Sequence, residues 1–268
     1  KESLFNIVIV GAGPTGVELA GSFAEIKKNI LPKDYHKIDF KNLNIYLIEG
    51  SKNTLNNMSE SSKIESNRYL SSMGVIIISE TYVKDYDGEN LVLSNNSNII
   101  SKTVIWTAGV IGNKIEGLSN DTITVGNRLK VDRINKIVES KNIFAIGDIA
   151  YMTTPKYPKA HPQVANVAIN QAKLLSKNLK KLVLNKSTSE YEYKDLGSMA
   201  TIGKNKAVVD LPYLHFKGYF AWLIWMFLHL MLVLSVKNKL IIFINWAWNY
   251  ITKDTSLGLI FNYEKNKK

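Results

Sequence analysis

The chain has 268 residues, of which 46% are hydrophobic and 21% charged, enough apolar surface for one large folded domain or two smaller ones. Lysine and arginine (34) outnumber aspartate and glutamate (23), and the net charge of +11 favours acidic partners such as phosphates, nucleotides or an anionic membrane face. The lack of cysteine excludes disulfides, iron–sulfur clusters and thiol catalysis within the chain. The four histidines stand far apart, so no metal site is predicted. Nucleic-acid binding is disfavoured, because the aromatic residues are not interleaved with arginine.

The first predicted unit is a strand, a glycine-rich turn and a helix. Asn6–Val10 is short, apolar and rich in β-branched residues, which suits a strand buried on both faces. After the turn, Val17–Ile26 has the apolar spacing of a helix. Lys27–Asn42 is polar and lysine-rich, as expected of an insertion or a loose helix extension, and Asn44–Ile48 is predicted as the second strand.

Further along the chain, apolar runs alternate with polar or glycine-rich segments. Ser51–Leu70 is polar and weakly helical, and Val164–Leu179 predicts a second long helix. Asp87-Gly88 lies between two apolar runs and predicts a hairpin turn. The remaining strands are predicted at Val75–Ile78, Thr103–Trp106, Leu129–Val131 and Asn142–Ile146.

The glycine-rich turn, Gly11-Ala12-Gly13-Pro14-Thr15-Gly16, has the context of a dinucleotide fingerprint: a strand before it and a helix after it. The first glycine permits the tight turn, the second lets the backbone approach a pyrophosphate, and the third allows helix and strand to pack closely. Pro14 stands in the first turn of the helix, where proline is best tolerated. The phosphates would face unpaired N–H groups at the helix N-terminus. The alternative is a glycine turn without a ligand.

Glu49 ends the second predicted strand, where the fingerprint requires an acidic residue. Its carboxylate would accept hydrogen bonds from the adenine-ribose diol and repel a 2′-phosphate, so we expect NADH to be preferred over NADPH. The spacing from the glycines exceeds the usual ~20 residues, because Lys27–Asn42 lies between.

Several segments, in chain order, resemble type II (alternative) NADH:quinone oxidoreductases, which are two-dinucleotide-binding flavoproteins. These segments are Gly11-Ala12-Gly13-Pro14-Thr15-Gly16-Val17-Glu18, Trp106-Thr107-Ala108-Gly109, Phe144-Ala145-Ile146-Gly147-Asp148, Gly197-Ser198-Met199-Ala200 and Gly203-Lys204-Asn205-Lys206-Ala207-Val208. The resemblance implies an α/β, Rossmann-like fold with a parallel sheet and β-hairpin insertions, and FAD and NADH as cofactors. Only one glycine fingerprint is present, so we expect the N-terminal FAD half to be absent from this chain. The lysine- and asparagine-rich composition resembles that of AT-rich protists such as malaria parasites.

The resemblance also implies residue roles. Asp148, after Gly147, would bond the ribityl or phosphate part of FAD, although a strand-end aspartate can instead cap backbone amides. Glu18 matches the catalytic glutamate that the family places near the nicotinamide, flavin and quinone. A carboxylate early in a helix also complements the helix dipole, which is the structural alternative. Ala108 and Gly109 would let the backbone approach the cofactors, or would merely turn the chain.

Ala165-Asn166-Val167-Ala168-Ile169 falls where the family carries Ala-Gln-Val-Ala-x, beside the flavin ring and the quinone. The resemblance therefore implies cofactor contacts from Gln163, Val164 and Ala165 and quinone contacts from Asn166 and Ile169. Asn166 replaces the usual glutamine and reaches less far, and Ile169 replaces a position that is often polar. An ordinary helix with a small-residue packing face is the alternative.

The C-terminal region is apolar. Gly218–Val236 contains no charged residue over 19 positions, and hydropathy alone slightly favours a membrane span there. Leu240–Ile251 is amphipathic, as in a helix that lies in the membrane interface, where Lys237, Lys239 and Lys253 would meet lipid phosphates. With the family's monotopic helix pair, this favours monotopic attachment over a span. A buried dimer interface is the alternative.

The leading hypothesis is a non-proton-pumping enzyme that transfers electrons from NADH through FAD to membrane ubiquinone, as a homodimer on the mitochondrial inner membrane. The expected regions are residues 1–119 (NADH-binding), 120–210 (returning part of the FAD-binding domain) and 211–268 (membrane-anchoring). One rival is a disulfide or ferredoxin reductase of the same fold, although no carboxylate follows His161-Pro162 closely. Another is a non-catalytic, NADH-binding membrane protein.

Overall fold

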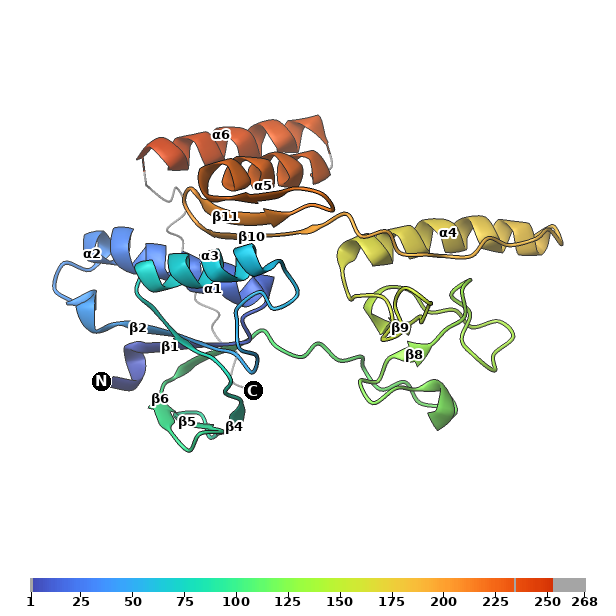
Figure 1. Cartoon of the computed structure of the whole chain (residues 1–268), viewed down its shortest axis with the longest axis horizontal. Coiled ribbons are helices and arrows are strands. Elements are labelled where there is room, and N and C mark those ends of the chain that lie inside the picture. The colour runs from blue at the N-terminus through green and yellow to red at the C-terminus, as the bar shows by residue number, and fades with distance from the viewer. Residues whose placement is uncertain (1, 234, 253–268) are drawn as a thin grey trace, which may run out of the picture. The chain divides into compact units, whose positions relative to one another are not determined.

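The computed structural model describes residues 2–233 and 235–252, which divide into two compact units (Figure 1). The first unit comprises Lys1–Ala108 and Leu196–Lys268, and the second comprises Gly109–Asp195. The helices and strands of the first unit are β1 (Asn6–Val10), α1 (Pro14–Asn29), α2 (Leu31–Asp34), β2 (Asn44–Ile48), α3 (Glu60–Ser72), β3 (Val75–Ile78), β4 (Val83–Tyr86), β5 (Asn90–Leu93), β6 (Asn98–Ile100), β7 (Thr103–Trp106), β10 (Ser198–Gly203), β11 (Lys206–Asp210), β12 (His215–Lys217), α5 (Gly218–Leu232) and α6 (Val236–Thr252). Those of the second unit are β8 (Leu129–Lys130), β9 (Ala150–Tyr151) and α4 (Ala165–Val183).

A four-stranded parallel sheet in the order β3-β2-β1-β7 forms the centre of the first unit. Its strands are short and apolar because both faces are covered, and β1 pairs with β2 from Asn6 to Val10 and with β7 from Ile7 to Val10. The strand predictions for β1, β2, β3 and β7 are confirmed residue for residue. So is the prediction of a parallel sheet.

The antiparallel sheet β4-β5-β6 is the predicted hairpin insertion and packs on one face of the parallel sheet. Leu91, Leu93 and Ile99 from the insertion share a buried cluster with Val8 and Val10 of β1. The third strand, β6, was not predicted from the sequence, because Asn98–Ile100 is only three residues long and buries one of its two isoleucines.

The helix α1 lies between the parallel sheet and a second antiparallel sheet, β10-β11-β12 (Figure 1). Gly21 allows this approach, since a Cβ there would lie 1.8 Å from the carbonyl oxygen of Ile202 in β10. Ala20 and Ala24 of the same helix are buried beside Val208 of β11. The small residues of α1 therefore determine how closely the two sheets can pack on either side of the helix.

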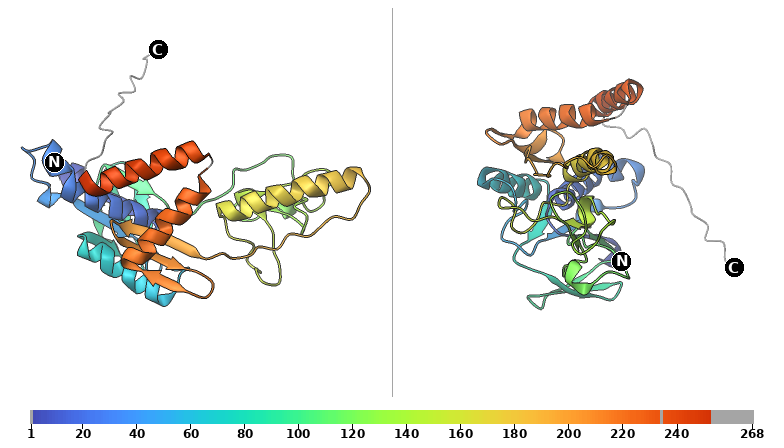
Figure 2. Two further views of the ribbon diagram at one scale, coloured as in Figure 1. Left: turned by 90° about the horizontal axis from the view of Figure 1, so that it is seen from above. Right: turned by 90° about the vertical axis from the view of Figure 1, so that its right-hand side faces the viewer.

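Helices α5 and α6 cover the outer side of the β10-β11-β12 sheet (Figure 2). The predicted apolar helix ends at Leu232, so α5 has 15 residues and spans roughly 22 Å, short of the ~30 Å hydrocarbon core. Among residues 2–233 and 235–252, no helix combines the length and the apolar character that crossing a membrane requires. The span that hydropathy alone slightly favoured is therefore wrong for the described residues. Lys253, one of the predicted lipid contacts, lies outside them.

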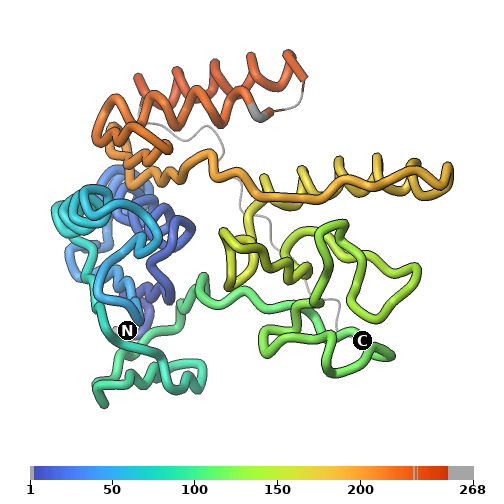
Figure 3. The backbone as a smooth tube through the Cα atoms, turned by 45° about the vertical axis from the view of Figure 1, so that its right-hand side comes forward, coloured from blue at the N-terminus to red at the C-terminus, as the bar shows by residue number. Residues whose placement is uncertain are grey.

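The second unit is mostly irregular before α4, as the backbone of residues 109–164 shows in Figure 3. The predicted helix at its C-terminal end is confirmed and runs from Ala165 to Val183. The predicted strand Asn142–Ile146 is wrong as a regular strand: its only strand-type pairing within the described residues is the isolated bridge between Lys136 and Phe144. A β-strand forms only where a neighbouring strand pairs with its backbone N–H and C=O groups, and this segment has a single bridge in place of such a strand.

Candidate functional site

The glycine-rich turn joins β1 to α1, and its three glycines have different surroundings. Gly11 has φ +101°, a conformation that favours glycine, and a Cβ there would lie 2.8 Å from the Cβ of Ala108. At Gly16 a Cβ would lie 1.8 Å from the carbonyl oxygen of Gly11, so only glycine lets the helix stand this close to the strand. A Cβ at Gly13 would meet nothing within 4 Å. The open side of the turn is thus at Gly13, which also caps α1.

The N-terminus of α1 is exposed at Gly13, Pro14 and Thr15. Pro14 occupies the first turn, as predicted, and no side chain caps the helix. The uncapped amides and the helix dipole therefore present partial positive charge at the open side of the turn. This arrangement suits the phosphate group of a nucleotide.

Glu49 lies at the end of β2, beside the turn. One carboxylate oxygen accepts a hydrogen bond from the Ala12 amide at 2.7 Å, and the other accepts from the amide and the hydroxyl of Ser51 at 2.8 and 2.5 Å. A carboxylate offers about four lone-pair sites, so one remains for a ribose hydroxyl. Glu49 thus holds the glycine turn in place, and this is a role beyond the ribose contact that the sequence predicts for it.

A cavity of about 370 Å³ opens at this edge of the parallel sheet, lined by Gly11, Glu49 and Ala108 among others. Tyr82 also lines it, is 66% exposed, and would meet a Cβ at Gly50 within 2.3 Å. The sequence interpretation did not single out Tyr82 as a residue of this cavity. An aromatic residue shortly after β3, at the carboxyl edge where such sheets bind ligands, was the available signal.

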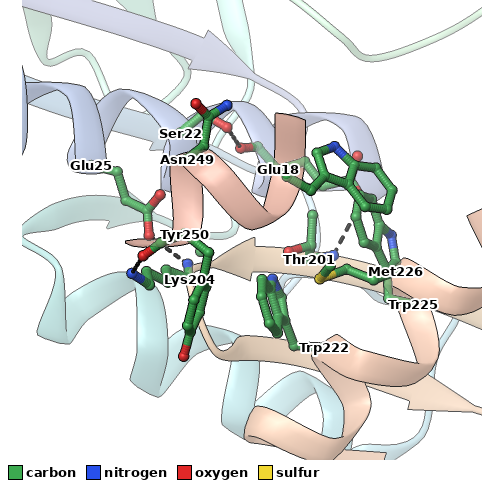
Figure 4. Close-up of a pocket in the computed structure, with 12 residues that line it drawn as sticks. Glu18, Ser22, Glu25, Thr201, Lys204, Trp222, Trp225, Met226, Asn249 and Tyr250 are labelled. Carbon is green, nitrogen blue, oxygen red and sulfur yellow. Dashed lines mark hydrogen bonds between the residues drawn. The ribbon is translucent and has the colours of Figure 1, made fainter. Parts of the chain in front are cut away.

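Glu18 lies one turn into α1 and faces a second cavity of about 290 Å³ (Figure 4). Its carboxylate accepts a hydrogen bond from the Thr201 amide of β10 at 3.2 Å. Burial raises the pKa of Glu18, and the Thr201 bond, His229 and Trp225 lower it by less. At a given pH a larger fraction of this carboxyl is therefore protonated than of an exposed glutamate.

The other side of this cavity is apolar and aromatic. Trp222, Trp225 and Met226 of α5 line it, and the indoles lie across from Glu25 and Lys204 in Figure 4. Within the described part of the chain, the buried indole N–H of Trp225 makes no hydrogen bond of good geometry, but it lies close enough to the Glu18 carboxylate to lower the pKa of that group. A cavity with an apolar wall, an indole N–H donor and a carboxyl suits a flat apolar ring that carries oxygen acceptors.

His229 stacks on Trp225, with ring centres 4.1 Å apart. Its Nδ1 lies 2.9 Å from the Trp225 carbonyl oxygen, and because a carbonyl only accepts, Nδ1 carries the proton. Trp225, His229 and Thr201 were not predicted as site residues. They come from a helix and a strand whose packing against α1 the sequence does not reveal.

In the second unit, Gly147 begins a 3₁₀ turn that contains Asp148. Gly147 has φ +71°, its amide donates to the Gln171 side chain at 2.7 Å, and a Cβ there would lie 3.2 Å from that of Ala168. The Asp148 side chain is exposed, while its carbonyl oxygen accepts from Arg128 at 2.9 Å and from Gln163 at 3.3 Å. Hydrogen bonds to its backbone thus fix the turn, and among the described residues none donates a hydrogen bond to the Asp148 carboxylate.

The N-terminus of α4 follows in the same unit. Val164 is its N-cap without a side-chain bond, and Val164 and Ala165 are exposed. Asn166 accepts a hydrogen bond from the Asn170 side chain at 2.7 Å, and Ile169 is 52% exposed. The first turn of α4 therefore offers free amides, while Asn166 is partly engaged within its own helix.

The residues predicted for the cofactors thus fall in both units. The first holds Gly11, Gly13, Pro14, Thr15, Gly16, Glu49 and Ala108, with Glu18 on the same helix as the turn. The second holds Gly109, Gly147, Asp148, Gln163, Val164 and Ala165, with Asn166 and Ile169. The open turn in the first unit fits a nucleotide pyrophosphate, and in the second the exposed carboxylate and uncapped helix fit one side of a flavin nucleotide.

Two family profiles match the chain: pyridine nucleotide-disulphide oxidoreductase over residues 1–172, and the NDH2 C-terminal domain over residues 196–253. Among curated relatives, the type II NADH:quinone oxidoreductase Ndh of Mycobacterium tuberculosis is 28% identical over 94% of this chain and 56% of its own length. The internal alternative NAD(P)H-ubiquinone oxidoreductase A1, mitochondrial, of Solanum tuberosum is 28% identical over 92% of this chain and 52% of its own length. The chain thus spans about half the length of these relatives.

Among solved structures, NDH2 from Plasmodium falciparum in complex with NADH aligns with a TM-score of 0.83, at 22% identity, over 94% of this chain and 66% of that one. A ferredoxin reductase from Rhodopseudomonas palustris aligns with a TM-score of 0.55, at 17% identity, over 78% of this chain and 48% of that one. These likenesses confirm the predicted Rossmann-like fold class.

Proposed function

The chain belongs to the pyridine nucleotide-disulphide oxidoreductase family, among its type II NADH dehydrogenases, and on that premise we propose that its whole protein oxidises NADH and reduces a membrane quinone. The proposed reaction uses FAD and pumps no protons. One observation carries the proposal. The single helix α1 presents the open glycine turn at its N-terminus and, one turn later, presents Glu18 to the aromatic cavity.

NADH would bind at the glycine turn. The open surface at Gly13 and the uncapped amides of α1 would receive its pyrophosphate, while Glu49 would accept a hydrogen bond from an adenine-ribose hydroxyl. The Glu49 charge, fixed by the Ala12 amide, disfavours an additional 2′-phosphate. Tyr82 would lie against the adenine. NADH is therefore the preferred nucleotide over NADPH.

FAD would be held in part by the second unit, through the exposed Asp148 carboxylate and the first turn of α4 with Gln163, Val164 and Ala165. Bound FAD would supply the redox chemistry, taking a hydride from NADH and passing two electrons to quinone. The α4 dipole favours negative charge at this end of the helix. Arg128 and Gln171 fix the backbone of the Asp148 turn rather than the cofactor.

In the first unit the quinone would meet the aromatic cavity beside Glu18. In the second unit the family resemblance implies quinone contacts from Asn166 and Ile169 of α4. In the aromatic cavity the Trp225 N–H would donate to a ring oxygen, and the apolar wall would exclude water. Glu18, with its raised pKa, would hold the proton that a reduced quinone oxygen requires. Glu18 is thus the proposed catalytic residue.

Attachment to the membrane would be monotopic, through α5 and α6. Their large apolar side chains are exposed, among them Phe220, Phe227, Ile244, Trp248 and Ile251. The name of the potato relative includes the word mitochondrial, which supports a mitochondrial location; the inner membrane and a homodimer are further parts of the proposal. In this proposal the expected regions 1–119, 120–210 and 211–268 take the roles of NADH binding, FAD binding and membrane attachment.

The test separates the two half-reactions in the intact gene product. Glu18→Gln keeps the shape of the side chain but cannot give up a proton, so we expect quinone reduction to slow by about 10²-fold. NADH-dependent reduction of the flavin should change by less than about threefold, because the glycine turn is untouched. Stopped-flow absorbance measures each step. The matched control Glu60→Gln, on α3 and outside both cavities, should leave both rates unchanged.

The pH profile supplies a second readout. Because burial raises the Glu18 pKa, quinone reduction should fall as rising pH removes its proton, and Glu18→Gln should abolish that limb. A variant with normal quinone reduction and the same pH profile would contradict the catalytic role of Glu18. Flavin reoxidised only by a disulfide or another acceptor would keep the fold and replace the quinone.

A further inference from the structure

A third cavity, of about 570 Å³, lies between the C-terminal half of α1 and the hairpin that joins β10 to β11. Three lysines line it: Lys28 of α1, and Lys204 and Lys206 of the hairpin. Asn29, Ser72 and Asn205 add neutral polar groups. Of these six residues only Lys204 also lines the aromatic cavity, and none was given a role there or at the glycine turn.

The charge of this cavity is positive. Glu25 is its only carboxylate, and one of its oxygens already accepts the Lys204 amide. Within residues 2–233 and 235–252, no ion pair neutralises Lys28 or Lys206. The C-terminus of α1 adds about half a negative charge, which leaves an excess of positive charge. The cavity therefore suits an anion.

The hairpin holds its polar groups in place. The Lys204 ammonium donates to the Tyr250 carbonyl oxygen at 2.7 Å and lies 4.0 Å from the centre of the Tyr250 ring. Asn205 has φ +63°, as asparagine tolerates in such turns, and its buried Oδ1 has no partner among the described residues. An asparagine amide can turn to offer its NH₂ instead. Asn205 thus brings an unsatisfied polar group to the cavity.

The cavity also borders the apolar helix pair. Asn249 of α6 lines it, and the neighbouring Trp248 and Ile251 of the same helix are 59% and 78% exposed. Ser22, Glu25, Lys204 and Asn249 line both this cavity and the aromatic cavity, and all four are labelled in Figure 4. A free phosphate would use the lysines alone, whereas an anionic lipid would also use the exposed apolar face.

We propose that the cavity lined by Lys28, Lys204 and Lys206 binds the phosphate headgroup of an acidic phospholipid whose chains lie along the apolar face of α6. The positive charge of the lysines favours an anionic headgroup. The exposed apolar side chains of α6 favour a lipid over a soluble anion, because they can contact the acyl chains. Because four residues are shared with the aromatic cavity, the bound lipid also stabilises one wall of that cavity.

The experiment titrates delipidated intact protein with dihexanoylphosphatidylglycerol below its micelle concentration, by calorimetry and without NADH or quinone. We expect saturable binding, and much weaker binding of dihexanoylphosphatidylcholine. Lys28→Gln with Lys206→Gln should weaken the phosphatidylglycerol affinity roughly ten- to thirtyfold. Lys28→Arg with Lys206→Arg should restore it, because the charge is kept.

The control removes the same charge elsewhere in the first unit. Lys33→Gln with Lys37→Gln changes two exposed lysines that line neither cavity and should leave the affinity within about twofold. Equal binding by wild type and Lys28→Gln/Lys206→Gln would overturn the proposal. Inorganic phosphate or glycerol phosphate binding as tightly as phosphatidylglycerol would overturn the lipid assignment. Since no redox step is measured, these outcomes are independent of the proposed enzyme activity.

Discussion

The backbone of the first unit is held mainly by strand ladders, whereas that of the second is held by turns, isolated bridges and side-chain hydrogen bonds together. In the first unit β1 is paired on both sides, by β2 and β7, so its polar backbone groups are satisfied within the sheet. In the second, the Arg128 guanidinium donates to the carbonyl oxygens of Asp148, Ala150 and His161. Asn135 likewise reaches the Ala145 carbonyl.

This difference predicts which substitutions should destabilise each unit. A paired sheet tolerates side-chain substitutions at its edges, but it does not tolerate added atoms where a helix packs directly on a strand. A backbone held by side-chain hydrogen bonds is destabilised when one of the polar side chains is removed. The glycine turn belongs to the first kind, and the turn at Asp148 belongs to the second. The predictions below start with the glycines of the first unit and end with His161 of the second.

Gly16→Ala should have the largest effect, because its Cβ would lie 1.8 Å from the Gly11 carbonyl oxygen. We expect a loss of about 3 kcal/mol or more in the stability of the first unit, together with loss of NADH binding. Thermal unfolding and NADH titration measure the two effects. Gly21→Ala, equally close to the Ile202 carbonyl oxygen, should be as destabilising although it lies away from the turn.

The matched variant Gly13→Ala separates folding from binding. Its Cβ would meet nothing within 4 Å, so the melting temperature should stay near that of wild type. NADH affinity should nevertheless drop by about tenfold or more, since the added methyl group would stand where the pyrophosphate approaches. Unchanged NADH affinity in folded Gly13→Ala would contradict the binding role of the turn.

Asp210→Asn should come next. The Asp210 carboxylate accepts hydrogen bonds from the amide and hydroxyl of Ser59, at 2.6 and 2.9 Å, from the Ser62 hydroxyl at 2.7 Å and from His215 at 2.9 Å. We expect a loss of about 2 kcal/mol, measured by denaturant unfolding. Asp85→Asn, the same change at an exposed position of β4, serves as the control.

The pH dependence of Asp210 has a definite sign. Burial raises its pKa, but the hydrogen bonds from Ser59, Ser62 and His215 outweigh that effect, so the net pKa is lowered. Its contribution to stability is therefore present above the ordinary aspartate pKa and is lost as pH falls through the lowered value. Asp210→Asn should remove this acid-sensitive component. An unchanged acid limb would show that another carboxylate governs it.

Glu49→Gln should have a smaller effect, on nucleotide choice. Glutamine keeps one acceptor oxygen for the Ala12 amide but loses the charge that repels a 2′-phosphate. We expect the preference for NADH over NADPH to fall by about tenfold, measured as the ratio of kcat/KM values. Glu80→Gln, an exposed glutamate beyond β3, is the control. A preference that stays unchanged would remove Glu49 from the specificity role.

The smallest effect is expected at His161 of the second unit, which is 1% exposed and packs against Tyr157, Tyr191 and Tyr193. Burial lowers its pKa, and Arg133 lowers it further, while Glu192 opposes this. The unfolded chain therefore takes up a proton near pH 6.5 that the folded unit does not. Stability is present above that pH and is lost as pH falls below it.

Hydrogen-exchange protection of the second unit between pH 7.5 and 5.5 measures this loss. His161→Phe should remove the pH dependence, because the phenyl ring keeps the aromatic packing and has no proton to bind. His36→Phe, at an exposed position, should keep it. The same pH dependence in His161→Phe and wild type would place its origin elsewhere.

The sequence predicts the first unit well because its signals are local. β-Branched runs define β1, β2, β3 and β7, and the glycine spacing defines the turn. The strand at Asn142–Ile146 was predicted for the same reason and is wrong, since pairing depends on a neighbour that no local pattern shows. Trp225 escaped prediction because only the packing of distant elements brings it to its cavity. Tyr82 was overlooked although its position shortly after β3 was a local signal.

The most direct measurement is an anaerobic visible spectrum of the purified intact gene product, with NADH and then a short-chain quinone added. The account predicts flavin absorbance that NADH bleaches and quinone restores, which would establish both half-reactions and the path of the electrons. A protein that binds NADH at the glycine turn but carries no flavin would contradict it, and would leave a membrane-attached nucleotide-binding protein.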